Sequence, residues 1–143
     1  MSSYADVVTY GREQGGGLLS SQPPIAFAAT TRPEHARAFY AFVLGLGLIE
    51  DTPQALVFDA GGTMLHVQKV RAFAPAPHTV LGWHVPDIVA AVRGLAARGV
   101  ACERAHGLAP DADGIWTSPS GARTVWFRDP DGNLLSLVQL PLP

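Results

Sequence analysis

Two histidines and a few neutral polar side chains stand within otherwise apolar, strand-like stretches of the sequence. His66 and Gln68 occupy alternate positions of the stretch 63–70, and His84 lies near the end of the stretch 80–85. An imidazole exchanges its proton near neutral pH and therefore suits a general base. These residue types predict proton transfer on a small molecule, or hydrogen bonding to one.

Other catalytic patterns find no support in the sequence. Cys102 is the only cysteine, and no histidine stands at a fixed short spacing from it, so a nucleophilic thiol is not indicated. A single cysteine also excludes an internal disulfide and a multi-cysteine metal centre, and it favours a reducing, cytoplasmic location. The glycines at 15–17 follow no predicted strand, so they are not expected to form a phosphate-binding loop.

The composition limits the partners of the chain. Its 143 residues suffice for one domain, 48% of them are hydrophobic, 15% are charged, and the formal net charge is −2. This balance does not favour binding to nucleic acid. Proline, glycine or charged residues interrupt every apolar stretch before it reaches the roughly 18–20 residues of a membrane span, and the first 22 residues lack the pattern of a secretion signal. We therefore expect a soluble protein with no nucleic-acid or membrane partner.

The first half of the chain predicts a strand, a helix and three further strands. Residues 1–24 show no sustained periodicity and are expected to form a flexible or loosely docked arm. The apolar stretch 25–29 predicts a strand. Thr31 and Glu34 predict a capping box for a helix with Pro33 in its first turn, and Gly45 is placed to end that helix. Its apolar stripe consists of Ala36, Phe39, Tyr40 and Val43. The stretches 46–49, 55–59 and 63–70 then predict three strands, the last two joined by a turn at 61–62.

The second half repeats this order. A strand at 80–85 precedes a helix that Asp87 caps and Gly99 ends. Its buried stripe consists of Ile88, Ala91, Val92 and Leu95. Strands are predicted at 100–104, 124–128 and 134–140, with a long loop at 105–121. The repeat favours one domain, 25–143, with two βαβββ modules at 25–70 and 80–140, although a plain α+β sandwich would also alternate strands and helices.

Two motifs resemble the signatures of the vicinal oxygen chelate superfamily, which comprises glyoxalases, bleomycin resistance proteins and extradiol dioxygenases. The first is Phe39-Tyr40 followed by Val-Leu-Gly-Leu at 43–46, and the second is Phe-Arg-Asp-Pro-Asp-Gly-Asn at 127–133. The resemblance covers residues 25–140 and implies an α+β fold in which two βαβββ modules form an eight-stranded open cup, often in a homodimer. Further stretches of the sequence resemble those of a subgroup of small bacterial members of this superfamily.

The resemblance also implies where a metal ion would bind. Metal-dependent members place ligands at four equivalent points inside the cup, and these points correspond to Ile25, His66, Val80 and Ser136. Isoleucine and valine have no lone pair to donate, and a neutral serine hydroxyl is a weak ligand. We therefore expect no bound metal and no cofactor. A slip of one residue would turn His66 to the other face of its strand.

Strand alternation places a mostly apolar set of side chains in the same cup. Such a surface suits a small-molecule site in which sparse hydrogen bonds orient the ligand. The predicted ligand-binding residues are Phe27, Met64, His66, Gln68, His84 and Ser136 from the strands, and Trp116 from the long loop. His66 could instead be a packed core residue, His84 a solvent-exposed one at the rim, and Gln68 a partner of nearby backbone. Trp83 and Trp126 are expected to pack in the core or at an interface.

Three functions remain open. The first is metal-free binding of a small apolar or aromatic molecule by a homodimer. The second is an enzyme of the lyase, isomerase or dioxygenase type, with His66 as catalytic base or with an atypical metal site. The third is a purely structural scaffold for protein interaction.

Overall fold

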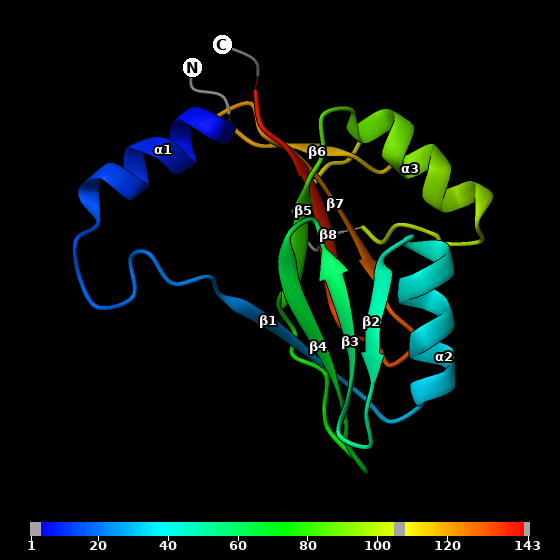
Figure 1. Ribbon diagram of the computed structural model, residues 1–143. Coiled ribbons are helices and arrows are strands. Elements are labelled where there is room, and N and C mark those ends of the chain that lie inside the picture. The colour runs from blue at the N-terminus through cyan, green and yellow to red at the C-terminus, as the bar shows by residue number, and fades with distance from the viewer. Residues whose placement is uncertain (1–3, 105–107, 142–143) are drawn as a thin grey trace.

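The computed structural model describes residues 4–104 and 108–141. Each half of the chain contributes one four-stranded sheet, and the helices α2 and α3 lie on the same side of both sheets (Figure 1). The first sheet has the order β1-β4-β3-β2 and the second has the order β5-β8-β7-β6. In each, the first strand pairs in parallel with the last, and the other neighbours are antiparallel. The repeated order confirms the predicted α+β fold with two βαβββ modules that form an open, unclosed cup.

The elements of the first module follow the predicted sequence of strand, helix and three strands. They are β1 (Ile25–Thr30), α2 (Pro33–Ala38), the π-helical turn η1 (Phe39–Val43), β2 (Gly47–Asp51), β3 (Ala55–Ala60) and β4 (Thr63–Lys69). The second module comprises β5 (Leu81–His84), α3 (Ile88–Ala97), β6 (Trp116–Thr117), β7 (Arg123–Arg128) and β8 (Leu134–Gln139). Gly45 and Gly99 follow the helices with φ of 75° and 83°, as predicted for left-handed helix ends.

The predicted capping box at the start of α2 is wrong. The N-cap of this helix is Arg32, and no side chain caps it. The hydroxyl of Thr31 instead donates to a carboxylate oxygen of Asp131, 2.8 Å away and 100 positions later in the chain. Thr31 therefore binds a residue distant in sequence and does not cap the helix. In α3 the local pattern holds, because the Asp87 carboxylate accepts a hydrogen bond from the backbone N–H of Ala90.

The predicted strand at 100–104 is also wrong. Only Glu103 meets the sheet, through an isolated bridge to Trp126. The edge of β7 next to it is occupied by β6, in which Trp116 pairs with Thr124. Two short segments therefore share the edge that the sequence assigned to one strand. Residues 105–107, at the start of the predicted loop, lie outside the described residues.

The predicted arm contains a helix that the sequence did not indicate, α1 (Tyr4–Gln14). None of its described residues is buried, and it lies to one side of the sheets (Figure 1). Its Tyr4 contacts the domain, because the Tyr4 ring stacks on His84 with centroids 4.6 Å apart. The flexibility of this arm stays a prediction. No helix in the described ranges is long and apolar enough to cross a membrane.

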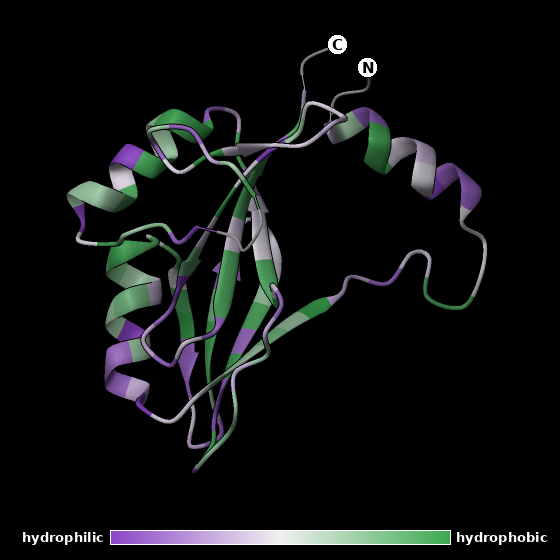
Figure 2. Cartoon of the chain, turned by 180° about the vertical axis from the view of Figure 1, so that it is seen from behind, coloured by the Kyte–Doolittle hydropathy of each residue, from purple (hydrophilic) through white to green (hydrophobic). Residues whose placement is uncertain are grey.

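One hydrophobic core joins the two modules on their helix side. Hydrophobic residues lie along the strands, on α3 and on the η1 end of the first helical segment (Figure 2). The core contains Phe58 and Leu65 from the first sheet and Phe127 and Leu135 from the second. The predicted helix stripes face it, with Ala36, Phe39 and Tyr40 buried in the first helical segment and Ile88, Val92 and Leu95 buried in α3.

A buried carboxylate connects the same modules. The Tyr40 hydroxyl donates to Asp129 at 2.7 Å, and the Asn133 side-chain amide donates to the same carboxylate oxygen at 2.7 Å. The Asn133 amide also donates to the backbone carbonyl of Ala29 at 2.8 Å. Burial, with the Asp129 charge as the second cause, raises the pKa of the Tyr40 phenol, so the phenol stays a neutral donor. The turn before β8 is thereby fixed to the first module.

We predict that Tyr40→Phe lowers the free energy of unfolding by about 1–3 kcal/mol, because it leaves a buried carboxylate without one of its donors. Chemical denaturation measures this change. Tyr10→Phe, at an exposed position of α1, is the matched control and should change stability by less than about 0.5 kcal/mol. Equal effects of the two substitutions would contradict the role given to Asp129.

A second prediction concerns the stability of the fold at low pH. Burial raises the pKa of Asp131, but hydrogen bonds from Thr30 and Thr31 outweigh it, so the folded pKa lies below the ordinary value of 3.8. A carboxylate with a lowered folded pKa stabilises the fold above its unfolded pKa, and this contribution is lost as the pH falls through the folded pKa. Stability should therefore drop below about pH 4, and Asp131→Asn should flatten that part of the curve. The midpoint of urea denaturation, measured between pH 2 and 7, reports this change. If the midpoint falls equally with acid in wild type and in Asp131→Asn, the role given to Asp131 is wrong.

Candidate functional site

Each sheet has a face turned away from the helices, which we call the open face. On the first sheet it carries the alternate residues of β1 and β4, because the intervening residues enter the core. Ile25 pairs with Met64, and Phe27 pairs with His66. The structure thus confirms the predicted phase of these strands. Ile25, Phe27 and Met64 are 47%, 51% and 41% exposed.

His66 is surrounded by apolar side chains on this face. Its Nε2 atom lies 3.1 Å from the sulfur of Met64, and its ring lies edge-on to Phe27 with centroids 5.4 Å apart. The imidazole is partly exposed, so it is a surface group and not the packed core residue of the alternative interpretation. Gln68 lies exposed one pleat further along β4. An apolar wall with one imidazole and one amide can hold an apolar molecule and orient it.

The open face of the second sheet holds the other predicted residues. Ser136 is buried and pairs with Gly82, and a Cβ at Gly82 would lie 2.5 Å from the Ser136 hydroxyl oxygen, so a larger residue there would require the hydroxyl to move. His84 ends β5 and is covered on one side by Tyr4. Trp116 belongs to β6, and its ring lies 6.1 Å from that of Trp126. Trp116 is thus a strand residue, although the sequence placed it in a loop.

The predicted residues form two groups, one per sheet. Phe27, Met64, His66 and Gln68 lie together on β1 and β4, while His84, Ser136 and Trp116 are spread over β5, β8 and β6. No hydrogen bond or ring contact joins the two groups within the described ranges. His84 borders two pockets, one next to η1 and α3 and one next to Tyr4 and Ala26.

The four points implied for metal ligands lie as two pairs, one on each sheet. Ile25 lies beside the His66 strand, and Val80 precedes the strand that pairs with Ser136. Among the residues that the structure describes, no group of three or more His, Cys, Asp or Glu side chains could hold a metal ion. The donor set at these points is one imidazole and one hydroxyl, which does not fit a divalent ion.

Sequence reasoning missed two residues that border pockets. Trp126 lines a hollow of about 430 Å³ with His78, Arg104 and Arg128. Trp83 packs against the core, as expected, and also lines a pocket beside η1. Alternation along β5 and β7 gives the faces of both tryptophans, but the neighbouring segments that complete the pockets come from elsewhere in the chain. Cys102 is half-buried, and burial raises the pKa of its thiol, which agrees with an unreactive cysteine.

Comparisons with known proteins give consistent results. The family model "Glyoxalase/Bleomycin resistance protein/Dioxygenase superfamily" matches residues 24–137. A search of curated proteins finds no match. A glyoxalase family protein from Bacillus anthracis has a similar structure, with TM-score 0.69 and 19% identity over 89% of this chain and 99% of that one. An antibiotic-binding protein from Streptomyces sp. CB03234, TnmS3, gives TM-score 0.68 and 25% identity over 87% and 100%. A lactoylglutathione lyase from Agrobacterium tumefaciens gives 0.61 and 24% over 82% and 95%.

Proposed function

From the premise that the chain belongs to the Glyoxalase/Bleomycin resistance protein/Dioxygenase superfamily, we propose that it binds a small apolar or aromatic molecule on its open faces without a metal ion. The observation that carries this proposal is the exposed apolar surface of β1 and β4, where Ile25, Phe27 and Met64 surround His66. Large apolar side chains grouped on a surface mark a binding site more often than a solvent face. The similarity to an antibiotic-binding protein supports the same function.

A second copy of the chain is the proposed partner. The open faces of both sheets carry exposed apolar side chains, including Ile25 and Phe27 on β1 and Val80 just before β5. A homodimer that brings the open face of one sheet against that of a partner would cover this surface and enclose a ligand between the two groups of site residues. The single cysteine supports a reducing, cytoplasmic setting for this protein.

The alternative is an enzyme of the same superfamily in which His66 acts as general base. Its partly exposed imidazole lies against Phe27 and Met64, where a bound substrate could reach it. The similarity to a lactoylglutathione lyase gives a first substrate to try. Turnover of lactoylglutathione that disappears in His66→Ala and persists in EDTA would favour this enzyme over a binding protein.

The metal-free state has a direct test. After purification without a metal-affinity step and dialysis, elemental analysis should find zinc, nickel, manganese and iron each far below one equivalent per chain. The reason is that three of the four points in question carry Ile25, Val80 and Ser136, which are poor ligands. About one equivalent of any of these metals would overturn the proposal.

Ligand binding is predicted to depend on the open face. The uncharged fluorophore N-phenyl-1-naphthylamine should bind wild-type protein, and Phe27→Ala should weaken it about tenfold, because it removes an aromatic wall of roughly 1.5 kcal/mol or more. Fluorescence titration measures this. Tyr10→Ala, at an exposed aromatic position of α1 away from both sheets, is the control and should leave the affinity unchanged. A loss in Tyr10→Ala alone would place the probe away from the open face and contradict the proposal.

A further inference from the structure

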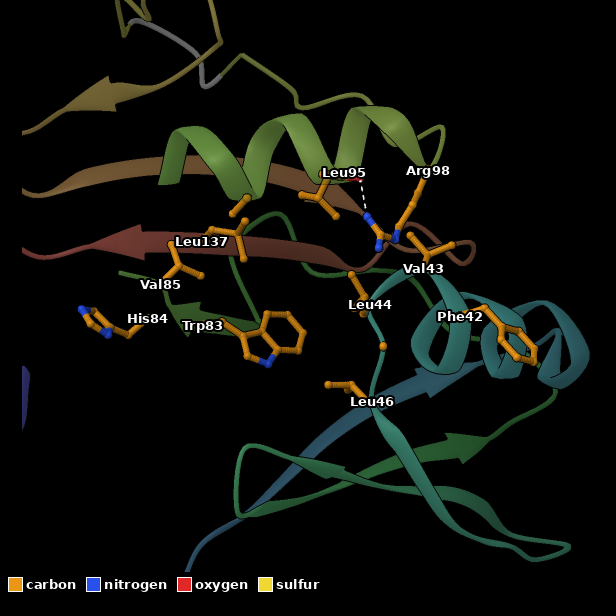
Figure 3. A pocket seen from close by; sticks show the side chains of 13 residues that line it. Phe42, Val43, Leu44, Leu46, Trp83, His84, Val85, Leu95, Arg98 and Leu137 are labelled. Atoms are coloured by element: carbon orange, nitrogen blue, oxygen red, sulfur yellow. Dashed lines mark hydrogen bonds between the residues drawn. The ribbon is translucent and has the colours of Figure 1, made fainter. Parts of the chain in front are cut away.

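A second pocket lies on the helix side of β5, opposite the open face. It has a volume of about 380 Å³ and is bordered by the end of η1, the chain entering β2, the strand β5 and the helix α3 (Figure 3). Trp83 and Leu137, which pair across β5 and β8, form part of its wall and belong to the core side of the sheet. Ser136 is adjacent to Leu137 in β8 and therefore faces the other way. Apart from His84, which ends β5 and also borders this pocket, the pocket shares no residue with the site proposed above, and Trp83 and Leu137 place its wall on the other face of the sheet.

The walls of the pocket are apolar. They include Leu46, Val85 and Leu95, and Phe42 at the edge is 79% exposed. The edge is formed where the π-helical turn ends, with the backbone N–H of Leu44 bonded to the carbonyl of Phe39 at 2.9 Å. π-Helical turns occur frequently at functional sites. The volume is in the range that holds a small organic molecule, and an occupant would cover the exposed aromatic ring.

Three side chains that line this space carry N–H groups, those of Arg98, Trp83 and His84, and the guanidinium of Arg98 is the permanently charged one. Arg98 extends from the end of α3 toward Val43 and Leu44 (Figure 3). One of its terminal nitrogens donates to the carbonyl of Gly94 at 3.0 Å, and it forms no salt bridge with the residues that the structure describes. The indole N–H of Trp83 has no hydrogen-bond acceptor among the residues that the structure describes.

The charge of the pocket selects the ligand. Its lining contains no aspartate or glutamate, so no carboxylate of the pocket itself neutralises the guanidinium. A guanidinium that keeps free N–H groups beside an apolar wall binds a carboxylate with two hydrogen bonds and excludes a cation. We propose that this pocket binds a small carboxylate with an aromatic or branched apolar body. The body lies between Trp83 and Leu46, and the carboxylate meets Arg98.

The test uses 1-naphthoate and follows the fluorescence of Trp83, whose contribution is identified with Trp83→Phe. Binding should be saturable, and Arg98→Gln should raise the Kd at least tenfold because a charge-assisted pair is lost. Arg93→Gln is the matched control, since Arg93 is exposed on the same helix and does not line the pocket. The neutral analogue 1-naphthamide should bind wild-type protein about as weakly as naphthoate binds Arg98→Gln.

The outcomes separate this inference from its competitors. If naphthoate and naphthamide bind equally well, or if Arg93→Gln has the effect of Arg98→Gln, the guanidinium is not the recognition group and the inference is wrong. Because Arg98→Gln also removes a bond that closes α3, Ala91→Phe is a second variant, which fills the pocket and should abolish binding while the Tm shows that the protein is folded. Unchanged binding in folded Ala91→Phe would overturn the inference. Loss of naphthoate binding in Phe27→Ala alone would place the carboxylate on the open face, which overturns this inference and leaves the proposed function standing.

Discussion

The arrangement of both modules depends on one buried carboxylate, that of Asp129. Four hydrogen bonds reach it, from the Tyr40 hydroxyl, from the Asn133 side chain and from the backbone N–H groups of Asp131 and Asn133. A buried charge is tolerated only when its lone pairs are satisfied, so all of these donors must be in place together. Tyr40 belongs to the first module and Asp129 to the second. A shift of one module relative to the other would therefore remove the Tyr40 hydrogen bond from this buried charge.

This constraint gives the second sequence motif a structural role. Asp129 and Asn133 hold the turn before β8, and the Asp131 carboxylate accepts hydrogen bonds from Thr30 and Thr31 at the end of β1. The end of β1 and the start of β8 are thus held next to each other, and this fixes the phase of both strands. Which side chains reach the open faces follows from that phase. The motif affects the open faces only indirectly, through the position of the strands, because none of its residues is among those that face the predicted ligand.

Local patterns predicted the strands and the helix stripes well, since alternation and helical spacing depend on neighbours in sequence. They failed where a residue distant in sequence forms the contact that the local pattern predicted. Thr31 has the spacing of a helix cap, yet Asp131 binds its hydroxyl. The stretch 100–104 has strand composition, yet Trp116 and Thr117 occupy the place beside β7. For the site, alternation placed Phe27 and His66 on one face correctly, but no local pattern could show that Tyr4 stacks on His84 or that Arg98 approaches Leu44.

The two surfaces available to small molecules differ because the core divides them. On the open face of the first sheet, His66 and Gln68 are neutral or titratable groups within an apolar wall, so an uncharged ligand loses little on leaving water there. On the helix side, Arg98 is exposed beside an apolar wall of the same kind, so its guanidinium is available to pair with an anionic group whose apolar body packs on that wall. Since β5 and β8 carry Trp83 and Leu137 on one face and Gly82 and Ser136 on the other, a shift of these strands would alter both surfaces.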